Sequence, residues 1–192
     1  MIALYLAPGA SSMAAHIALN EIGAAFEIRP ISFARQEQRA AGFLALNPEG
    51  KVPVLLIDGL VLTEVAAILF YLARRFPQAG LLPDDAAAQA QAISWMSFIA
   101  ATVHPARQRG LEHARKVYAL ADRKLGRPDW ILGRYSIADI HLFRLYWRFL
   151  NSLRPAPQDY PNLTALHDRM MAREAVQKTI ASESAIGYEL PA

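Results

Sequence analysis

Residues 47–64 constrain the fold more than any other part of the chain, because a proline stands where a strand begins. The segment reads NPEGKVPVLLIDGLVLTE. Pro53 has no backbone N–H to donate to a sheet, so it fits the first residue of a strand rather than its interior. The apolar run 54–57 follows, and Asp58-Gly59 is a dipeptide typical of tight hairpins. The segment therefore predicts a strand headed by proline, a hairpin turn and a second short strand.

A helix is expected directly after this hairpin. Thr63 can cap it, since a threonine hydroxyl accepts an N–H group at a helix start. Apolar side chains then recur at helical spacing on one face, at Val65, Ile68, Leu69, Leu72 and Phe76. If the Val52-Pro53 bond is cis, the backbone N–H and C=O of Val52 can pair with an extended peptide as an added strand would. We therefore expect a peptide-like ligand at Val52 and Pro53.

The first part of the chain mixes strands and helices. Residues 2–6 and 26–30 read as strands on either side of a helix at 12–23, which makes a βαβ unit with parallel strands. A polar helical segment is expected at 36–46, before the hairpin. This order of elements resembles a thioredoxin-like domain.

The second part of the chain shows no strand pattern. A linker at 79–85, rich in proline and acidic residues, separates a first domain at 1–78 from a helical domain at 86–192. Within the helical domain, Ser136 and Asp139 have the spacing of a capping box. The helix that they open is apolar on nearly every side, so we expect it at the centre of the second domain.

The composition excludes several kinds of site. The chain has no cysteine, which rules out disulfides, thiolate metal sites and any mechanism that uses a protein thiol. Its histidines show no pairing of metal ligands at helical spacing, so no metal is expected. The net charge of +3 is modest, and acidic residues interrupt the basic residues at 107–127, so we expect no nucleic acid. No leader or membrane span is predicted, which favours a cytoplasmic protein.

Three separated segments resemble one family. Residues 8–19, PGASSMAAHIAL, resemble the first turn and helix of bacterial beta-class glutathione transferases. Residues 47–64 resemble their glutathione-binding centre, and 130–139, WILGRYSIAD, resemble the capped core helix of their second domain. The resemblance implies the glutathione transferase fold, with an α/β thioredoxin-like N-terminal domain and an all-α C-terminal domain. It also implies glutathione as co-substrate, a hydrophobic electrophile as second substrate, and a homodimer.

The resemblance and the chemistry of the residues together predict a glutathione site on the first domain. The backbone at Val52-Pro53 would pair with the cysteine of glutathione. The helix N-terminus at Glu64-Val65 would face the γ-glutamyl carboxylate, and the Glu64 carboxylate would take the ammonium group. Glu64 can equally be a first-turn charge that the helix dipole favours.

Two further positions concern the carboxylates of glutathione. Arg35 and Lys51 are candidates for the glycine carboxylate. Val65 stands where many relatives have a serine, whose hydroxyl would add one hydrogen bond. We expect glutathione binding to be weaker by roughly 1 kcal/mol for that reason.

Ser11 stands where beta-class enzymes usually carry cysteine. Serine cannot form a mixed disulfide, so reactions through a protein disulfide are not expected. Its hydroxyl can still donate to the glutathione thiolate and lower a thiol pKa that begins near about 8.5. Ser12 could take the same role, and both serines could instead cap the first helix. His104 falls where relatives carry a histidine that faces the site, although a structural role is open to it too.

These inferences favour a cytoplasmic, homodimeric glutathione transferase that conjugates glutathione to small hydrophobic electrophiles. The alternative is a transferase-like binding or carrier protein with little or no catalytic activity, since a fold does not dictate its function. The chain between His104 and Trp130 is shorter than in the relatives that it resembles. We expect a more open electrophile pocket from this.

Overall fold

The computed structural model describes residues 1–189, which form two compact units. The first unit comprises Met1–Phe76 and the C-terminal segment from Glu174, and the second comprises Pro77–Arg173. The boundary near residue 77 follows the change from mixed to helical sequence. The final helix differs from expectation, because it groups with the first unit rather than with the other C-terminal helices.

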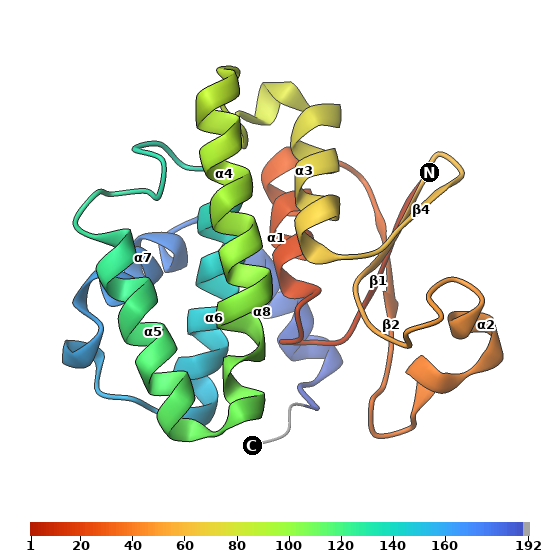
Figure 1. The fold of residues 1–192 in the computed structure, drawn as a ribbon. Coiled ribbons are helices and arrows are strands. Elements are labelled where there is room, and N and C mark those ends of the chain that lie inside the picture. Colours follow the sequence, from red (N-terminus) through yellow and green to blue (C-terminus); the bar gives the residue numbers. More distant parts are fainter. Residues whose placement is uncertain (190–192) are drawn as a thin grey trace. The chain divides into compact units, whose positions relative to one another are not determined.

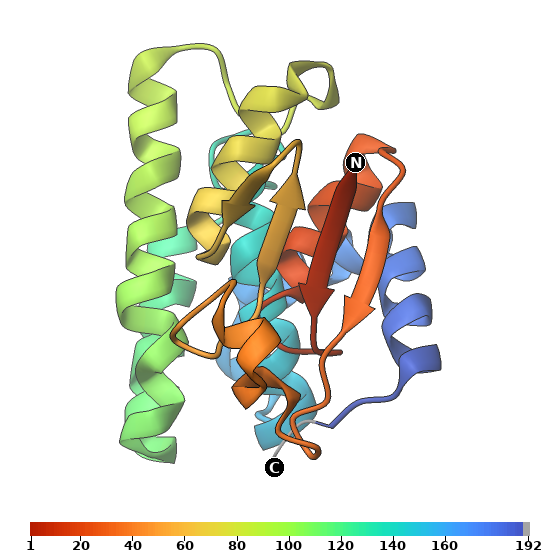
Figure 2. The same ribbon diagram turned by 90° about the vertical axis from the view of Figure 1, so that its right-hand side faces the viewer.

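The first unit is built on a four-stranded sheet with the order β2-β1-β3-β4 (Figures 1 and 2). Its strands are β1 (Ile2–Leu6), β2 (Glu27–Pro30), β3 (Val54–Ile57) and β4 (Leu60–Leu62). The β1 and β2 strands are parallel, as the βαβ pattern predicted, and β3 runs antiparallel to both β1 and β4. Asp58 and Gly59 connect β3 to β4 with positive φ angles of 50° and 85°, which is the geometry that tight hairpins favour.

Helices cover the sheet of this unit. Figure 2 shows α1 and α3 behind the strands, and α8 packs against α1. The segment predicted as one helix at 36–46 is instead two short pieces, because Ala40 between them has an extended backbone with ψ 142°. The helices of the unit are α1 (Met13–Ile22), η1 (Glu37–Arg39), α2 (Ala41–Leu44), α3 (Val65–Arg75) and α8 (Glu174–Ile186).

The second unit is helical throughout its regular structure. Helix α6 is buried from Ile137 to Phe149, which confirms the core helix expected from its apolar sequence. The first long helix of the unit ends at Phe98, and the chain continues as a π-helical turn and then a 3-10 helix that contains Pro105. The elements of the unit are η2 (Pro77–Ala79), α4 (Ala86–Phe98), η3 (Ile99–Val103), η4 (His104–Arg109), α5 (Leu111–Leu125), α6 (Ile137–Leu153), η5 (Pro157–Asp159) and α7 (Pro161–Met171).

The predicted capping box is present at the start of α6. The Asp139 carboxylate accepts the backbone N–H of Ser136 at 2.8 Å, and the Ser136 hydroxyl accepts the N–H of Ala138 at 3.3 Å. Asp139 also accepts the N–H of Ile131 at 2.8 Å, which fixes the loop before the helix. Burial raises the pKa of the Asp139 carboxyl to about 6. The hydrogen bonds that this carboxyl accepts lower its pKa, but their effect is smaller than that of burial.

His141 lies in the core of α6 and makes the second unit sensitive to acid. It is buried, and no described residue bonds its Nδ1. Burial, with smaller contributions from His104 and Arg144, lowers the pKa of the imidazole from 6.5 to about 3. The unfolded chain therefore binds a proton that the folded chain rejects, so stability is lost as pH falls below about 6.5.

We expect His141→Leu to remove this dependence. Between pH 7 and pH 5, the unfolding free energy of the wild-type protein should fall relative to that of the variant by roughly 2 kcal/mol. Urea titrations of both proteins at the two pH values measure this difference. Parallel changes in the two proteins would show that His141 does not titrate as its burial requires.

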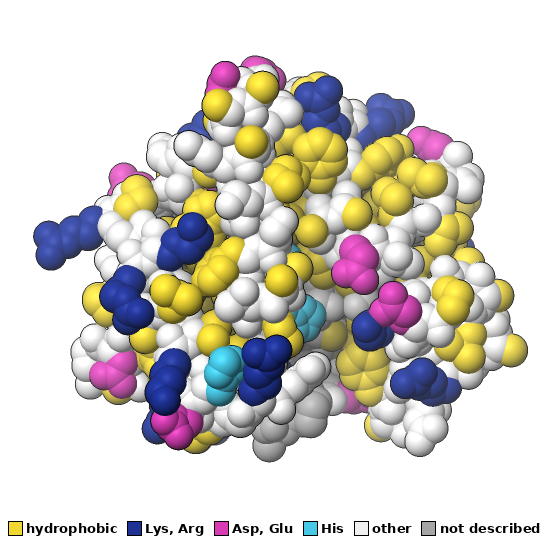
Figure 3. Space-filling model, viewed as in Figure 1, with side chains coloured by type: hydrophobic (Ala, Val, Ile, Leu, Met, Phe, Trp, Pro, Cys, Tyr) yellow, Lys and Arg dark blue, Asp and Glu magenta, His cyan; other side chains and the backbone are white. Residues whose placement is uncertain are grey.

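Charges of both signs share the surface in Figure 3. On α5, the Lys116 ammonium lies 2.7 Å from the Glu112 carboxylate. The guanidinium of Arg169, on α7, lies 3.8 Å from the Asp129 carboxylate. Acidic residues therefore lie next to at least two of the basic residues of the second half. In the part of the chain that is described, none of the helices combines the length and the apolar character that crossing a membrane requires.

Candidate glutathione site

The backbone of Val52 lies outside the sheet, next to the first loop. The Val52-Pro53 peptide bond is cis, which is the condition under which Val52 can pair with an extended peptide. Pairing with β1 begins at Val54, which lies opposite Tyr5. The carbonyl of Val52 accepts a hydrogen bond from the Ser11 hydroxyl at 2.8 Å. Its N–H has no partner among residues 1–189, so a ligand can take it.

The two serines of the first loop have different surroundings. Ser11 is half-buried and contacts the Val52 carbonyl. Ser12 is fully buried, and its hydroxyl bonds both the N–H and the carbonyl of Ala7 at 3.2 Å. Ser12 occupies the N-cap position of α1, yet its side chain bonds none of the helix N–H groups in the described structure. Its hydroxyl therefore holds the turn, while that of Ser11 faces the predicted site.

A buried glutamate from the end of the chain anchors this loop. The Glu183 carboxylate accepts the backbone N–H of Gly9 at 2.6 Å and lies 3.0 Å from Nδ1 of His16. Glu183 is 0% exposed and His16 1%, so the pair is shielded from water. Sequence reasoning missed this contact because Glu183 lies 174 residues from Gly9. An acidic residue within the otherwise buried face of α8 was the available signal.

The N-terminus of α3 has an unusual backbone at Glu64. The expected cap, Thr63, was wrong, because Glu64 occupies the N-cap position and no side chain of the described structure caps the helix there. Glu64 has φ 66° and ψ 120°, a conformation that costs a residue with a side chain about 1–3 kcal/mol and is concentrated at ligand sites. Val65 follows as the first helical residue and is buried. The free N–H groups of this turn can therefore meet an anion.

Lys51 and Arg35 are exposed and paired with neighbouring carboxylates. The Lys51 ammonium lies 2.6 Å from Glu49, which raises the pKa of Lys51, and the charge of Glu64 adds to this effect. Lys51 therefore lies close enough to Glu64 to interact with it. Arg35 lies 2.9 Å from the Glu37 carboxylate. Either cation can exchange its partner for a ligand carboxylate, because both pairs are exposed and such pairs are weak.

The loop that carries Arg35 already binds one carboxylate of the chain. Glu189 accepts the hydroxyl of Ser32 at 2.8 Å and the N–H of Ala34 at 3.0 Å. These bonds lower the pKa of the Glu189 carboxyl, with the Ala34 N–H as the largest cause. The C-terminal segment is thereby attached to the loop after β2.

His104 belongs to the second unit, where it is exposed at the start of η4. The other predicted residues, Ser11, Ser12, Arg35, Lys51, Val52, Pro53, Glu64 and Val65, belong to the first unit. Within that unit, a hydrogen bond links Ser11 to Val52 and the charge interaction links Lys51 to Glu64.

Comparison with known proteins agrees with this geometry. Residues 1–74 match the model for the N-terminal domain of glutathione S-transferases, and residues 81–174 match the model for their C-terminal domain. The chain belongs to the glutathione S-transferase family. Glutathione S-transferase GstA of Escherichia coli O157:H7 is 32% identical over 94% of this transferase and 98% of its own length.

Solved structures of other transferases share the fold. A beta-class enzyme of Sphingomonas chungbukensis has a TM-score of 0.82 and 33% identity, over 94% of this chain and 98% of its own. A sphingomonad glutathione S-transferase in complex with glutathione has a TM-score of 0.86 and 32% identity, over 95% and 98% of the two chains. The predicted fold, a thioredoxin-like α/β domain followed by a helical domain, is confirmed. The chain is a glutathione transferase enzyme, as the resemblance implied.

Proposed function

We propose that this transferase binds reduced glutathione on its first unit and adds the glutathione thiolate to small hydrophobic electrophiles. The observation that carries the proposal is the pair formed by Val52 and Ser11. It brings together an unpaired backbone N–H, a carbonyl and a hydroxyl. The first two are the groups that an extended peptide needs, and the hydroxyl is a donor for a sulfur anion.

Binding begins with an exchange of hydrogen bonds at Val52. In the free protein the Ser11 hydroxyl donates to the Val52 carbonyl. When glutathione adds to this edge, its cysteine N–H takes over that carbonyl, and its cysteine carbonyl accepts the Val52 N–H. The Ser11 hydroxyl is then released to donate to the thiolate, and a charged acceptor makes the stronger hydrogen bond.

The γ-glutamyl end and the glycine end of glutathione each bind to polar or charged groups of the first unit. The γ-glutamyl carboxylate meets the N–H groups at the start of α3, where Glu64 and Val65 lie, and the Glu64 carboxylate pairs with the ammonium group. Arg35 and Lys51 serve the glycine carboxylate. Held in this way, the thiolate needs only an oriented electrophile, so catalysis consists largely of positioning and of stabilising the nucleophile.

We further propose a cytoplasmic homodimer, and a supporting position for His104 beside the sulfur. These features rest on the family resemblance. The experiment that tests the proposed function is turnover of an activated aryl chloride with reduced glutathione. Conjugation well above the rate without enzyme supports it, and a rate equal to that of the uncatalysed reaction contradicts it.

Val65→Thr tests the site at α3. The change adds a hydroxyl with almost no change in side-chain shape, at the turn that faces the γ-glutamyl carboxylate. We expect the dissociation constant of glutathione to fall about fivefold, which corresponds to one net hydrogen bond. Calorimetric titration measures it, with Val65→Ala as the matched control without a hydroxyl. Equal dissociation constants for Val65→Thr and the wild type would place the carboxylate elsewhere.

A further inference from the structure

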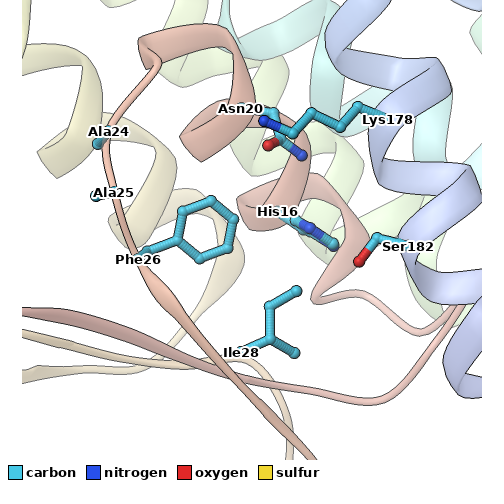
Figure 4. Close-up of a pocket in the computed structure, with 8 residues that line it drawn as sticks. All are labelled: His16, Asn20, Ala24, Ala25, Phe26, Ile28, Lys178 and Ser182. Carbon is cyan, nitrogen blue, oxygen red and sulfur yellow. The ribbon is translucent and has the colours of Figure 1, made fainter.

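A concave site lies in the first unit, between α1, the chain that enters β2, and α8. Its volume is about 260 Å³. Figure 4 shows His16 in the middle of the lining side chains, with Phe26 and Ser182 on either side of it and Ile28 opposite Asn20 and Lys178. None of these side chains belongs to the glutathione site proposed above. The inference drawn from them stands apart from the proposed function.

His16 brings a hydrogen-bonding atom to this pocket. Its Nδ1 lies 3.0 Å from the Glu183 carboxylate, and a carboxylate only accepts, so the proton of the neutral ring is on Nδ1. The Nε2 atom is then a hydrogen-bond acceptor. No residue of the described range bonds it, and it is not among the buried side-chain atoms that lack a partner, so the pocket reaches this side of the ring. An acceptor that lines a pocket can take a hydrogen bond from a ligand in place of water.

Hydrogen-bond donors, one of them a cation, lie at the rim of the pocket. Lys178 is exposed, and its ammonium group forms no ion pair with any residue that the structure describes. Ser182 lies one turn further along the same face of α8 and adds a hydroxyl. A ligand in the pocket thus meets a cation at one end and an acceptor at the other.

The remaining wall is apolar and aromatic. The ring of Phe26 stands edge-on to the ring of His16, with 5.6 Å between the centroids and 80° between the planes. Ile28 of β2 continues this surface. Such a wall favours an aromatic ring over a flexible chain, because rings pack in edge-to-face contact with other rings. A pocket smaller than the roughly 300–1,000 Å³ of drug-sized sites has space for a single ring.

We propose that this pocket binds a small aromatic acid that carries a hydroxyl group. The hydroxyl donates to Nε2 of His16, the ring packs against Phe26 and Ile28, and the carboxylate pairs with Lys178. The hydroxyl, the ring and the carboxylate of the ligand thus each contact a different part of the pocket. The ligand class can therefore be tested one group at a time.

The test is an NMR titration of the full chain with 4-hydroxybenzoate, in the presence of saturating glutathione. We expect saturable shifts of the His16 ring nitrogens, largest at Nε2, and of the amides around Lys178. Benzoate lacks the hydroxyl and should bind about five- to tenfold more weakly. Phenol lacks the carboxylate and should bind about three- to tenfold more weakly.

Two variants separate this pocket from the electrophile site. Lys178→Met should weaken binding of 4-hydroxybenzoate about three- to tenfold and leave that of phenol unchanged. Lys116→Met, an exposed lysine of the second unit, should change neither. The proposal is overturned if the His16 nitrogens show no saturable shift, if the three ligands bind equally, or if the two variants behave alike. The first of these results would mean that the pocket holds water only.

Discussion

Glu183→Ala is expected to lower the unfolding free energy of the protein by roughly 3–5 kcal/mol, because two buried donors lose their acceptor and a cavity forms. The wild-type carboxylate accepts the Gly9 N–H at 2.6 Å and faces His16 at 3.0 Å, and neither donor is open to water. Alanine would deprive both buried donors of this acceptor, and it would also leave a cavity. Urea or thermal unfolding measures the loss.

Two matched variants test whether the loss of stability comes from the hydrogen bonds of Glu183. Glu183→Gln keeps the shape and one acceptor, so it should lose less stability than Glu183→Ala. Glu174→Ala removes a carboxylate from the exposed start of the same helix and should cost at most about 1 kcal/mol. If Glu183→Ala and Glu174→Ala lose equal stability, the glutamate does not anchor the loop of Ser11.

The second large effect is on turnover. Ser11→Ala should reduce kcat roughly ten- to a hundredfold, because a hydrogen bond to a charged acceptor contributes about 1.5–3 kcal/mol. The dissociation constant of glutathione should change far less, since the backbone of Val52 and the start of α3 hold the peptide. Steady-state kinetics together with calorimetry separate the two quantities.

Ser11→Thr is the conservative control, because it keeps the hydroxyl and should retain most of the turnover. Ser12→Ala should act mainly on stability, since among residues 1–189 its hydroxyl bonds Ala7 alone. If kcat of Ser11→Ala equals that of the wild type, the thiolate is stabilised by another group. The remaining candidates are then His104, Ser12 or a backbone N–H.

The features predicted from sequence are those that local chemistry determines. Pro53 marked the start of a strand because it cannot donate within a sheet, and Asp58-Gly59 fixed the hairpin through their positive φ angles. Ser136 and Asp139 identified the start of the core helix because a capping box needs only residues three positions apart. Each of these signals lies within a few residues of the structure that it predicts.

The features that sequence reasoning missed depend on contacts between distant parts of the chain. The bonds of Glu183 to Gly9 and of Glu189 to Ser32 join the two ends of the sequence. The same contacts place α8 with the first unit, which no local pattern shows. The cap at α3 was misplaced by one residue because Glu64 takes a positive φ, against the preference of its own side chain.

Amide hydrogen exchange at Val52, followed by NMR with and without reduced glutathione, tests the central claim most directly. The Val52 N–H has no partner within the described chain, so it should exchange rapidly in the free protein. Pairing with the ligand should slow its exchange by at least about tenfold, while the amide of Leu55 within β3 is protected in both states. Exchange at Val52 that stays the same at every glutathione concentration would contradict the account.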